Sequence, residues 1–253
     1  MPLPQIEEKI SFHDVGFKYP SSEHEILKNI NLEFKKGEVV AIVGENGSGK
    51  TTLIKLLCRL YDVNDGTIRF DGKDIKAISL SDVRQKISVI FQDYAEYFLS
   101  VKENIQISDM HQPLDMQRIE QSAKNTGADG FINDLPLAYE NMLGLRFMRG
   151  NQLSGGQWQK IALARAFYKD AEIIILDEPS SAIDPLAEAT IFEHFQALAK
   201  DKILILVTHR LYNLKIADKI VVLQQGEVVE AGTHEELVAQ GGLYLEMFEQ
   251  QVD

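Results

Sequence analysis

The chain has 253 residues, of which 45% are hydrophobic and 25% are charged, an ordinary composition for a globular protein with a substantial core. Its net charge of −12 argues against nucleic acid as the main partner, because a phosphate backbone requires a basic surface. The single cysteine, Cys58, excludes an internal disulfide, and no apolar run approaches the ~20 residues of a membrane span. If the protein works at a membrane, we expect other segments or subunits to cross it.

The first third of the chain predicts mainly strands. Strands are predicted over residues 9–19, 31–34, 39–43, 67–71 and 87–91. Residues 39–43 form a continuous apolar run, which is typical of a buried strand, and residues 52–60 carry apolar residues at helical spacing. A brief capped helix is expected after Ser79.

A glycine-rich segment, residues 44–51, joins the buried strand to the first helix. Its glycines allow the backbone N–H groups to turn inward around phosphate oxygens, and the helix N-terminus adds partial positive charge. Lys50 is expected to reach the β- and γ-phosphates and Thr51 to bind Mg²⁺. The residues expected to contact the triphosphate are Gly44, Asn46, Gly47, Ser48, Gly49, Lys50, Thr51 and Thr52. A chance glycine-rich turn is the alternative, and the strand and helix on either side disfavour it.

The remaining elements alternate between helices and strands. Helices are predicted over residues 101–107, 114–125, 154–168 and 185–200 and after Thr233, and strands over residues 172–176, 203–207, 218–223 and 227–230. The pattern predicts an α/β fold with a mostly parallel core sheet. We expect the helical middle to be an inserted subdomain and the early alternating strands to form a smaller antiparallel sheet.

Two carboxylates, Asp177 and Glu178, follow the apolar run of residues 173–176. Open parallel sheets bind ligands at the C-terminal ends of their strands, which is where these acids are expected. Asp177 suits a Mg²⁺ site next to a phosphate-binding loop, and Glu178 could orient and deprotonate an attacking water. Two solvated acids at a strand end are the alternative.

The segment Leu-Ser-Gly-Gly-Gln, residues 153–157, precedes a helix and predicts a second phosphate-binding helix N-terminus. One triphosphate does not need two such sites in the same fold. With the other motifs, this segment resembles the signature of the nucleotide-binding domain of ATP-binding-cassette (ABC) transporters, and the resemblance covers nearly the whole chain. It implies that Ser154, Gly155, Gly156 and Gln157 serve the ATP held by the other copy in a head-to-tail dimer.

The resemblance also implies roles for four further residues. Gln92 matches the glutamine that contacts Mg²⁺ and the water, and Asp184 matches the aspartate that couples the two sites of the dimer. His209 matches the histidine that contacts the γ-phosphate, and Tyr19 the aromatic residue that stacks on adenine. Taken alone, each could be an ordinary polar, structural or strand residue.

The family implies one ABC nucleotide-binding domain over residues 1–253. Its catalytic core and β subdomain are expected at about residues 1–95 and 168–253, and its helical subdomain at about residues 96–167. The implied activity is Mg²⁺-dependent ATP hydrolysis that powers transport. The implied partners are a second copy of the chain and transmembrane domains, which would hold it on the cytoplasmic side of the cell membrane.

An exporter is the preferred interpretation. The stretch of residues 143–152 is longer than the short Glu-Arg-Gly segment common in exporters, and with Trp158 it resembles exporters of lantibiotics and related bacteriocin peptides. An importer ATPase is the main alternative, and a soluble ABC ATPase acting on DNA or ribosomes is less favoured because only one cassette is present and no long coiled coil separates its motifs. A GTPase is disfavoured because no Asn-Lys-x-Asp element occurs. We expect the chain to be a piece of a longer half-transporter rather than a separate subunit.

Overall fold

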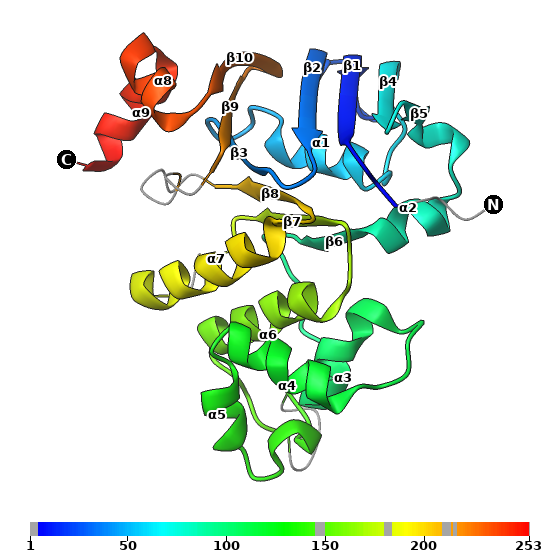
Figure 1. Ribbon diagram of the computed structural model, residues 1–253, viewed down its shortest axis with the longest axis vertical. Coiled ribbons are helices and arrows are strands. Elements are labelled where there is room, and N and C mark those ends of the chain that lie inside the picture. Colours follow the sequence, from blue (N-terminus) through cyan, green and yellow to red (C-terminus); the bar gives the residue numbers. More distant parts are fainter. Residues whose placement is uncertain (1–4, 145–149, 180–183, 209–213, 215–216, 253) are drawn as a thin grey trace. The chain divides into compact units, whose positions relative to one another are not determined.

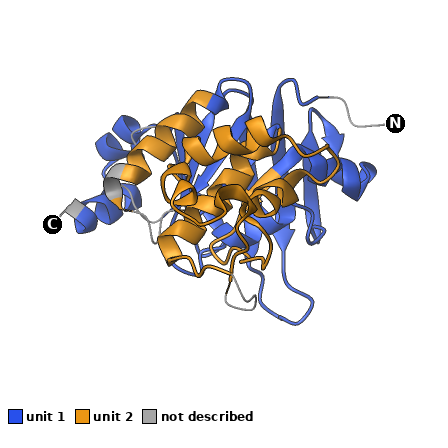
Figure 2. Ribbon diagram, turned by 90° about the horizontal axis from the view of Figure 1, so that it is seen from below, with its two compact units in different colours: residues 1–87, 172–177, 198–253 blue, residues 88–171, 178–197 orange. Residues whose placement is uncertain are grey.

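The computed structural model describes residues 5–144, 150–179, 184–208, 214 and 217–252. The chain divides into two compact units (Figure 2). One, here called the sheet unit, comprises residues 1–87, 172–177 and 198–253, and the other, the helical unit, comprises residues 88–171 and 178–197.

The smaller sheet of the sheet unit is antiparallel and has the strand order β2-β1-β4-β5 (Figure 1). Its strands are β1 (Lys9–Phe17), β2 (Leu27–Lys35), β4 (Asp65–Phe70) and β5 (Lys73–Asp74). Ile10 pairs with Phe34 on one side and with Phe70 on the other, and all three side chains are buried. The alternation of apolar and polar residues therefore places one face of this sheet in the core.

The larger sheet is mostly parallel and has the order β10-β9-β3-β8-β7 within the sheet unit. Its strands are β3 (Val39–Val43), β7 (Ile173–Asp177), β8 (Ile203–Val207), β9 (Lys219–Gln224) and β10 (Glu227–Gly232), of which β10 is antiparallel. Every residue of β3, β7 and β8 is buried, as expected for parallel strands covered on both faces. Val207 pairs with both Ile42 and Asp177, so these three strands end at the same edge of the sheet.

Short helices complete the sheet unit. They are α1 (Lys50–Leu57), η1 (Ile75–Ala77), α2 (Leu80–Lys86), α8 (His234–Gln240) and α9 (Leu243–Val252). The Ser79 hydroxyl accepts a hydrogen bond at the start of α2, and Thr233 and Glu236 form a capping box at the start of α8. Leu237 and Tyr244 pack with residues of β3 and β9 in one hydrophobic cluster, which attaches the C-terminal helices to the sheet.

Strand β6 (Ile87–Ile90) begins at the last residue of the sheet unit's first segment and leads into the helical unit. The helices that follow are α3 (Val101–Gln106), η2 (Ile107–Asp109), α4 (Met116–Asn125), α5 (Asp129–Asn133), η3 (Ala138–Glu140), α6 (Gly155–Tyr168) and α7 (Pro185–Ala199), which belongs to this unit as far as residue 197. Side chains of α6, including Trp158 and Ile161, pack with Ile105 of α3 and Ile119 of α4. The predicted signature segment thus begins the helix that holds this unit together.

The predicted α/β class, with a mostly parallel sheet and a smaller antiparallel sheet, is confirmed. Helices α5 and α9 were not predicted, and α1 ends at Leu57 instead of near residue 60. Arg59 adopts φ 50°, a left-handed conformation that ends a helix, and its guanidinium donates to the carbonyls of Ile75 and Ile78. Over the ranges that the structure describes, no helix is both long enough and apolar enough to span a bilayer.

Candidate functional site

The glycine-rich loop connects β3 to α1, and two of its glycines are required by close packing. Gly44 has φ 149°, and a Cβ there would lie 2.2 Å from the Leu223 carbonyl oxygen. Gly49 has φ 108°, and a Cβ there would lie 2.6 Å from Leu27 Cδ2. A side chain at position 44 would displace the loop from the strand β9 backbone, and one at position 49 would strain the backbone and push the Leu27 side chain aside.

The middle of the loop fits a bound anion. Gly47 is exposed with φ 82°, and a Cβ built there meets no atom within 4 Å. The next residue, Ser48, is buried, and its hydroxyl oxygen has no hydrogen-bond partner among the described residues. Because a buried hydroxyl normally has a partner, this orphan beside an open backbone turn fits a phosphate oxygen as the missing acceptor.

Lys50, the first residue of α1, is buried and bends back over the loop. Its Nζ donates to the carbonyl oxygens of Gly44 at 2.8 Å and of Glu45 at 2.9 Å. The loop thus holds a cation against its own backbone, at the N-terminal end of a helix, where negative charge is favoured.

Thr51 and Asp177 meet at the C-terminal edge of the larger sheet. The Thr51 hydroxyl donates to Asp177 Oδ2 at 3.2 Å, although the two residues are 126 positions apart. Asp177 is the last residue of β7 and is 2% exposed. A hydroxyl and a carboxylate are the hard oxygen ligands that Mg²⁺ prefers, so this pair could supply part of a Mg²⁺ site.

Tyr19 lies beside the start of the same helix. Its hydroxyl is 3.0 Å from Thr52 Oγ1, and Lys55 Nζ is 6.0 Å from its ring centroid. The rings of Phe17 and Tyr61 stand edge-on or nearly so to it, with centroids 5.0 and 5.1 Å away. The sheet unit therefore brings together Tyr19, the loop with Thr52, and Asp177 from three distant segments.

Glu178 is the first residue of the helical unit's last segment, directly after Asp177. It adopts φ 51°, an uncommon conformation for a residue with a Cβ, and is half-buried. Such backbone strain often marks functional residues. Gln92 follows β6 and is exposed in the same unit.

The signature segment starts α6 with a complete capping box. The Ser154 hydroxyl accepts a hydrogen bond from the Gln157 backbone N–H, and Gln157 Oε1 accepts one from the Ser154 N–H at 2.9 Å. Ser154 and Gly155 are exposed, and Gly156 is partly so. The Gln157 side chain thus shapes the turn, and the first N–H groups of α6 end at the surface.

Asp184 caps α7 through its Oδ1, which accepts from the Ala187 N–H at 3.0 Å, and it is exposed. The predicted residue His209 lies outside the described residues. The same applies to residues 145–149 of the long stretch before the signature and to residues 181–183 before Asp184.

Sequence reasoning did not single out Tyr94 and Arg165. The Arg165 side chain is buried in the helical unit and donates to the carbonyl oxygens of Ala95 at 2.8 Å and Asn104 at 2.9 Å. Burial lowers the pKa of Arg165 to about 10, so the group remains charged at neutral pH. Tyr94 donates its hydroxyl hydrogen bond to the Gly155 carbonyl. The one available signal was their nearness in sequence to Gln92 and to the signature.

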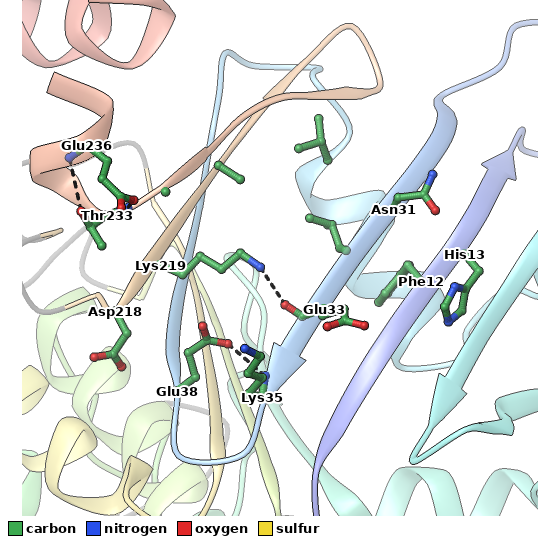
Figure 3. A pocket seen from close by; sticks show the side chains of 14 residues that line it. Phe12, His13, Asn31, Glu33, Lys35, Glu38, Asp218, Lys219, Thr233 and Glu236 are labelled. Carbon is green, nitrogen blue, oxygen red and sulfur yellow. Dashed lines mark hydrogen bonds between the residues drawn. The ribbon is translucent and has the colours of Figure 1, made fainter. Parts of the chain in front are cut away.

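A pocket of about 590 Å³ in the sheet unit is lined by residues of β1, β2, β9 and β10 (Figure 3). Figure 3 shows Lys219 extended toward β2, where its Nζ donates to the Glu33 carbonyl at 3.1 Å. Glu38 Oε2 accepts from the Lys35 N–H at 2.9 Å. Because charged groups of the lining bond to the protein itself, and because the lining includes none of the predicted site residues, we assign this pocket no ligand.

Comparison with known proteins gives consistent matches. The family model described as ABC transporter matches residues 27–181. The chain is 45% identical over 251 residues to the "Subtilin transport ATP-binding protein SpaT" of Bacillus subtilis, covering 98% of this chain and 40% of that protein. It is 43% identical over 235 residues to the "Nisin transport ATP-binding protein NisT" of Lactococcus lactis subsp. lactis, covering 93% and 39%.

Two further similarities extend this result. The "Leukotoxin translocation ATP-binding protein LktB" of Mannheimia haemolytica is 42% identical over 243 residues, which are 96% of this chain and 34% of that protein. A solved structure, "Structure of a bacterial Atm1-family ABC exporter with ATP bound", superposes with a TM-score of 0.92 at 33% identity, covering 99% of this chain and 43% of that one. The chain therefore spans about two fifths or less of the length of the three curated relatives.

Proposed function

The chain belongs to the ABC transporter family, and from that premise we propose that it binds ATP, hydrolyses it and so powers export across a membrane. ABC transporter ATP-binding proteins are ATPases coupled to transport. The observation that carries the proposal for this chain is the arrangement at the end of β3 and β7. There, a glycine loop whose Ser48 hydroxyl has no partner in the described part of the chain lies next to Lys50 and the Thr51–Asp177 pair.

The loop residues have separate tasks in this proposal. The backbone from Gly44 to Gly49 and the Ser48 hydroxyl surround the phosphates, and Lys50 exchanges its loop carbonyls for β- and γ-phosphate oxygens. Tyr19 provides an aromatic face for adenine. Thr51, Asp177 and Gln92 would hold Mg²⁺, which when bound neutralises charge on the β- and γ-phosphate oxygens.

Glu178 is proposed as the general base, and His209 as a contact to the γ-phosphate. Glu178 accepts a proton from water while the water oxygen bonds to the γ-phosphorus. The bond from that phosphorus to the oxygen shared with the β-phosphate breaks, which leaves ADP and phosphate.

The signature segment is proposed to act on a second copy of the chain. Its helix N-terminus lies in the helical unit, whereas the phosphate loop lies in the sheet unit. In a head-to-tail dimer, Ser154, Gly155, Gly156 and Gln157 of each copy would face the ATP held by the other, and Asp184 would couple the two sites. Hydrolysis would remove the γ-phosphate that joins the copies and allow the dimer to open.

Export, and a peptide such as a lantibiotic as cargo, are proposed from the relatives. Their names concern transport of subtilin and of nisin and translocation of leukotoxin, and the solved structure is titled an exporter. Because the chain spans only part of these relatives, we propose that transmembrane domains outside this chain hold it on the cytoplasmic side of the membrane.

Glu178→Gln tests the assignment of the general base. The variant keeps the size of the side chain but cannot accept the proton, so ATP hydrolysis should fall by about 10²- to 10⁴-fold, while ATP binding stays within about twofold. Steady-state phosphate release and equilibrium binding of ATP with Mg²⁺ measure the two effects. Glu193→Gln, at an exposed position of α7, is the matched control and should hydrolyse ATP normally. Near-normal hydrolysis by Glu178→Gln would refute this role.

A further inference from the structure

Within the helical unit, the segment between β6 and α3 contacts α6 through three closely spaced residues, Tyr94, Ala95 and Tyr97. The Tyr94 hydroxyl donates to the Gly155 carbonyl oxygen at 3.0 Å. The next residue, Ala95, accepts from Arg165 Nη1 at 2.8 Å. Two residues later, the Tyr97 ring lies under the same guanidinium, with 4.9 Å from Arg165 Cζ to the ring centroid.

The Gly155 carbonyl belongs to the peptide unit that joins Gly155 to Gly156. The N–H of that unit is in the first turn of α6, where N–H groups have no carbonyl partner within the helix. A hydrogen bond accepted by the carbonyl fixes the plane of the peptide and polarises its N–H. The Tyr94 hydroxyl thus acts on the Gly156 N–H from the opposite side of the peptide.

Within α6 the Gly155 carbonyl occupies an ordinary acceptor position of the helix, and the Tyr94 hydroxyl adds a bond to it from another segment. The capping box fixes Ser154 and Gln157, the residues on either side. Between them are two glycines, which have no side chains to restrict the backbone. The hydrogen bond from Tyr94 therefore adds a restraint from another segment to a peptide whose two residues carry no side chains.

The Tyr94 hydroxyl stays protonated and can donate at neutral pH. The backbone of the segment that contains Tyr94 is held by other hydrogen bonds. Burial raises the pKa of Tyr94, so the hydroxyl keeps its proton at neutral pH. Asn104 is fully buried, and its Nδ2 donates to the carbonyl oxygens of Tyr97 at 3.0 Å and Leu99 at 3.2 Å. Removal of the Tyr94 hydroxyl should therefore delete one hydrogen bond without releasing the segment.

We propose that Tyr94 is a positioning residue for the signature segment, holding the Gly155–Gly156 peptide so that its N–H faces the triphosphate bound by a second copy of the chain. This inference rests on the proposed head-to-tail function of that segment. It assigns Tyr94 no contact with the nucleotide of its own copy.

The test is Tyr94→Phe in the Glu178→Gln chain, where ATP stays bound. At low protein concentration, where the chain is monomeric, ATP affinity should stay within about twofold of the parent. At saturating ATP and Mg²⁺, sedimentation should show a weaker dimer. One neutral hydrogen bond corresponds to about 2- to 10-fold per site, and a dimer contains two such sites, so its dissociation constant should rise by about 4- to 100-fold.

Tyr139→Phe in the same parent is the matched control. Tyr139 is half-buried and packs against the same hydrophobic cluster as Tyr94. Its variant therefore removes a tyrosine hydroxyl from the same cluster but leaves the hydrogen bond to Gly155 intact. It should dimerise like the parent. Thermal midpoints of all three chains separate dimer weakening from loss of folding.

Three outcomes would overturn the inference. If the parent dimerises and Tyr94→Phe dimerises as tightly, the positioning role of Tyr94 is refuted, even if the thermal midpoint is lower, and the proposed function stands. If Tyr94→Phe weakens ATP binding by the monomer as much as it weakens the dimer, the effect does not act through the signature segment. If the parent itself does not dimerise with ATP, the proposed function is overturned, and the positioning role with it.

Discussion

At the residue scale, Thr51 and Asp177 show how folding brings two short motifs into contact. Each residue lies at the end of a regular element. Thr51 is in the first turn of α1, and Asp177 is the last residue of the fully buried strand β7. Their 3.2 Å hydrogen bond places a hydroxyl and a carboxylate at one edge of the sheet. Because both supply oxygen, the pair is suited to a hard cation such as Mg²⁺.

Tyr19 allows a second test at this scale. If its ring stacks on adenine, Tyr19→Ala should weaken ATP binding by about 5- to 100-fold, the range that base–aromatic stacking gives on alanine substitution. Tyr19→Phe keeps the ring, loses only the hydroxyl contact to Thr52, and should retain most of the affinity. Isothermal titration with ATP and with inorganic tripolyphosphate distinguishes base from phosphate contacts. An equal loss of affinity for tripolyphosphate would contradict adenine stacking.

At the element scale, the last two helices depend on a carboxylate in β10. Glu230 accepts from the Leu243 N–H at 2.6 Å and from the Tyr244 N–H at 3.0 Å, so it caps the start of α9 from a neighbouring strand. The helix in turn contributes Tyr244 to the buried cluster beside β3 and β9, and burial raises the pKa of Tyr244 to about 12. One side chain thus connects a strand edge, a helix start and a core residue.

Glu230→Gln tests this cap. A neutral amide replaces the charged acceptor of two backbone N–H groups, so the free energy of unfolding should fall by about 0.5–2 kcal/mol, the usual range for loss of a helix cap. Urea denaturation followed by circular dichroism measures the change. Glu227→Gln, at an exposed position of the same strand, is the control and should change stability by less than about 0.5 kcal/mol. Equal stability of the two variants would contradict a capping role.

At the scale of the whole molecule, the two separate elements proposed to bind phosphate predict an assembly that depends on nucleotide. The loop at β3 and the start of α6 belong to different compact units. In such a dimer, each ATP would join the loop of one copy to the signature segment of the other, so both elements would be used twice. ATP hydrolysis would then allow the dimer to dissociate.

The corresponding prediction concerns oligomeric state. Without nucleotide the chain should sediment as a monomer, and with ADP it should remain one. With ATP and Mg²⁺, the Glu178→Gln chain should form a dimer in proportion to protein concentration, whereas Lys50→Ala, which lacks the loop cation, should not. Sedimentation velocity over a tenfold range of concentration measures this. A stable dimer without nucleotide would contradict the ATP-dependent assembly.

The sequence by itself determined the fold class and the family, because the responsible signals are local. Apolar runs predicted the buried strands, which the structure confirms, and the glycine spacing with Lys50 and Thr51 agreed with the family. It could not give α5 and α9, which are short or depend on a distant cap such as Glu230.

The tertiary structure alone decided which side chains meet. The hydrogen bonds of Thr51 with Asp177 and of Tyr94 with Gly155 join residues 126 and 61 positions apart, and no local pattern encodes either distance. The buried Arg165 depends on the same packing, because a guanidinium is stable there only where carbonyl oxygens from other segments surround it. The motifs are present in the sequence before folding, whereas contacts between them exist only after the chain has packed.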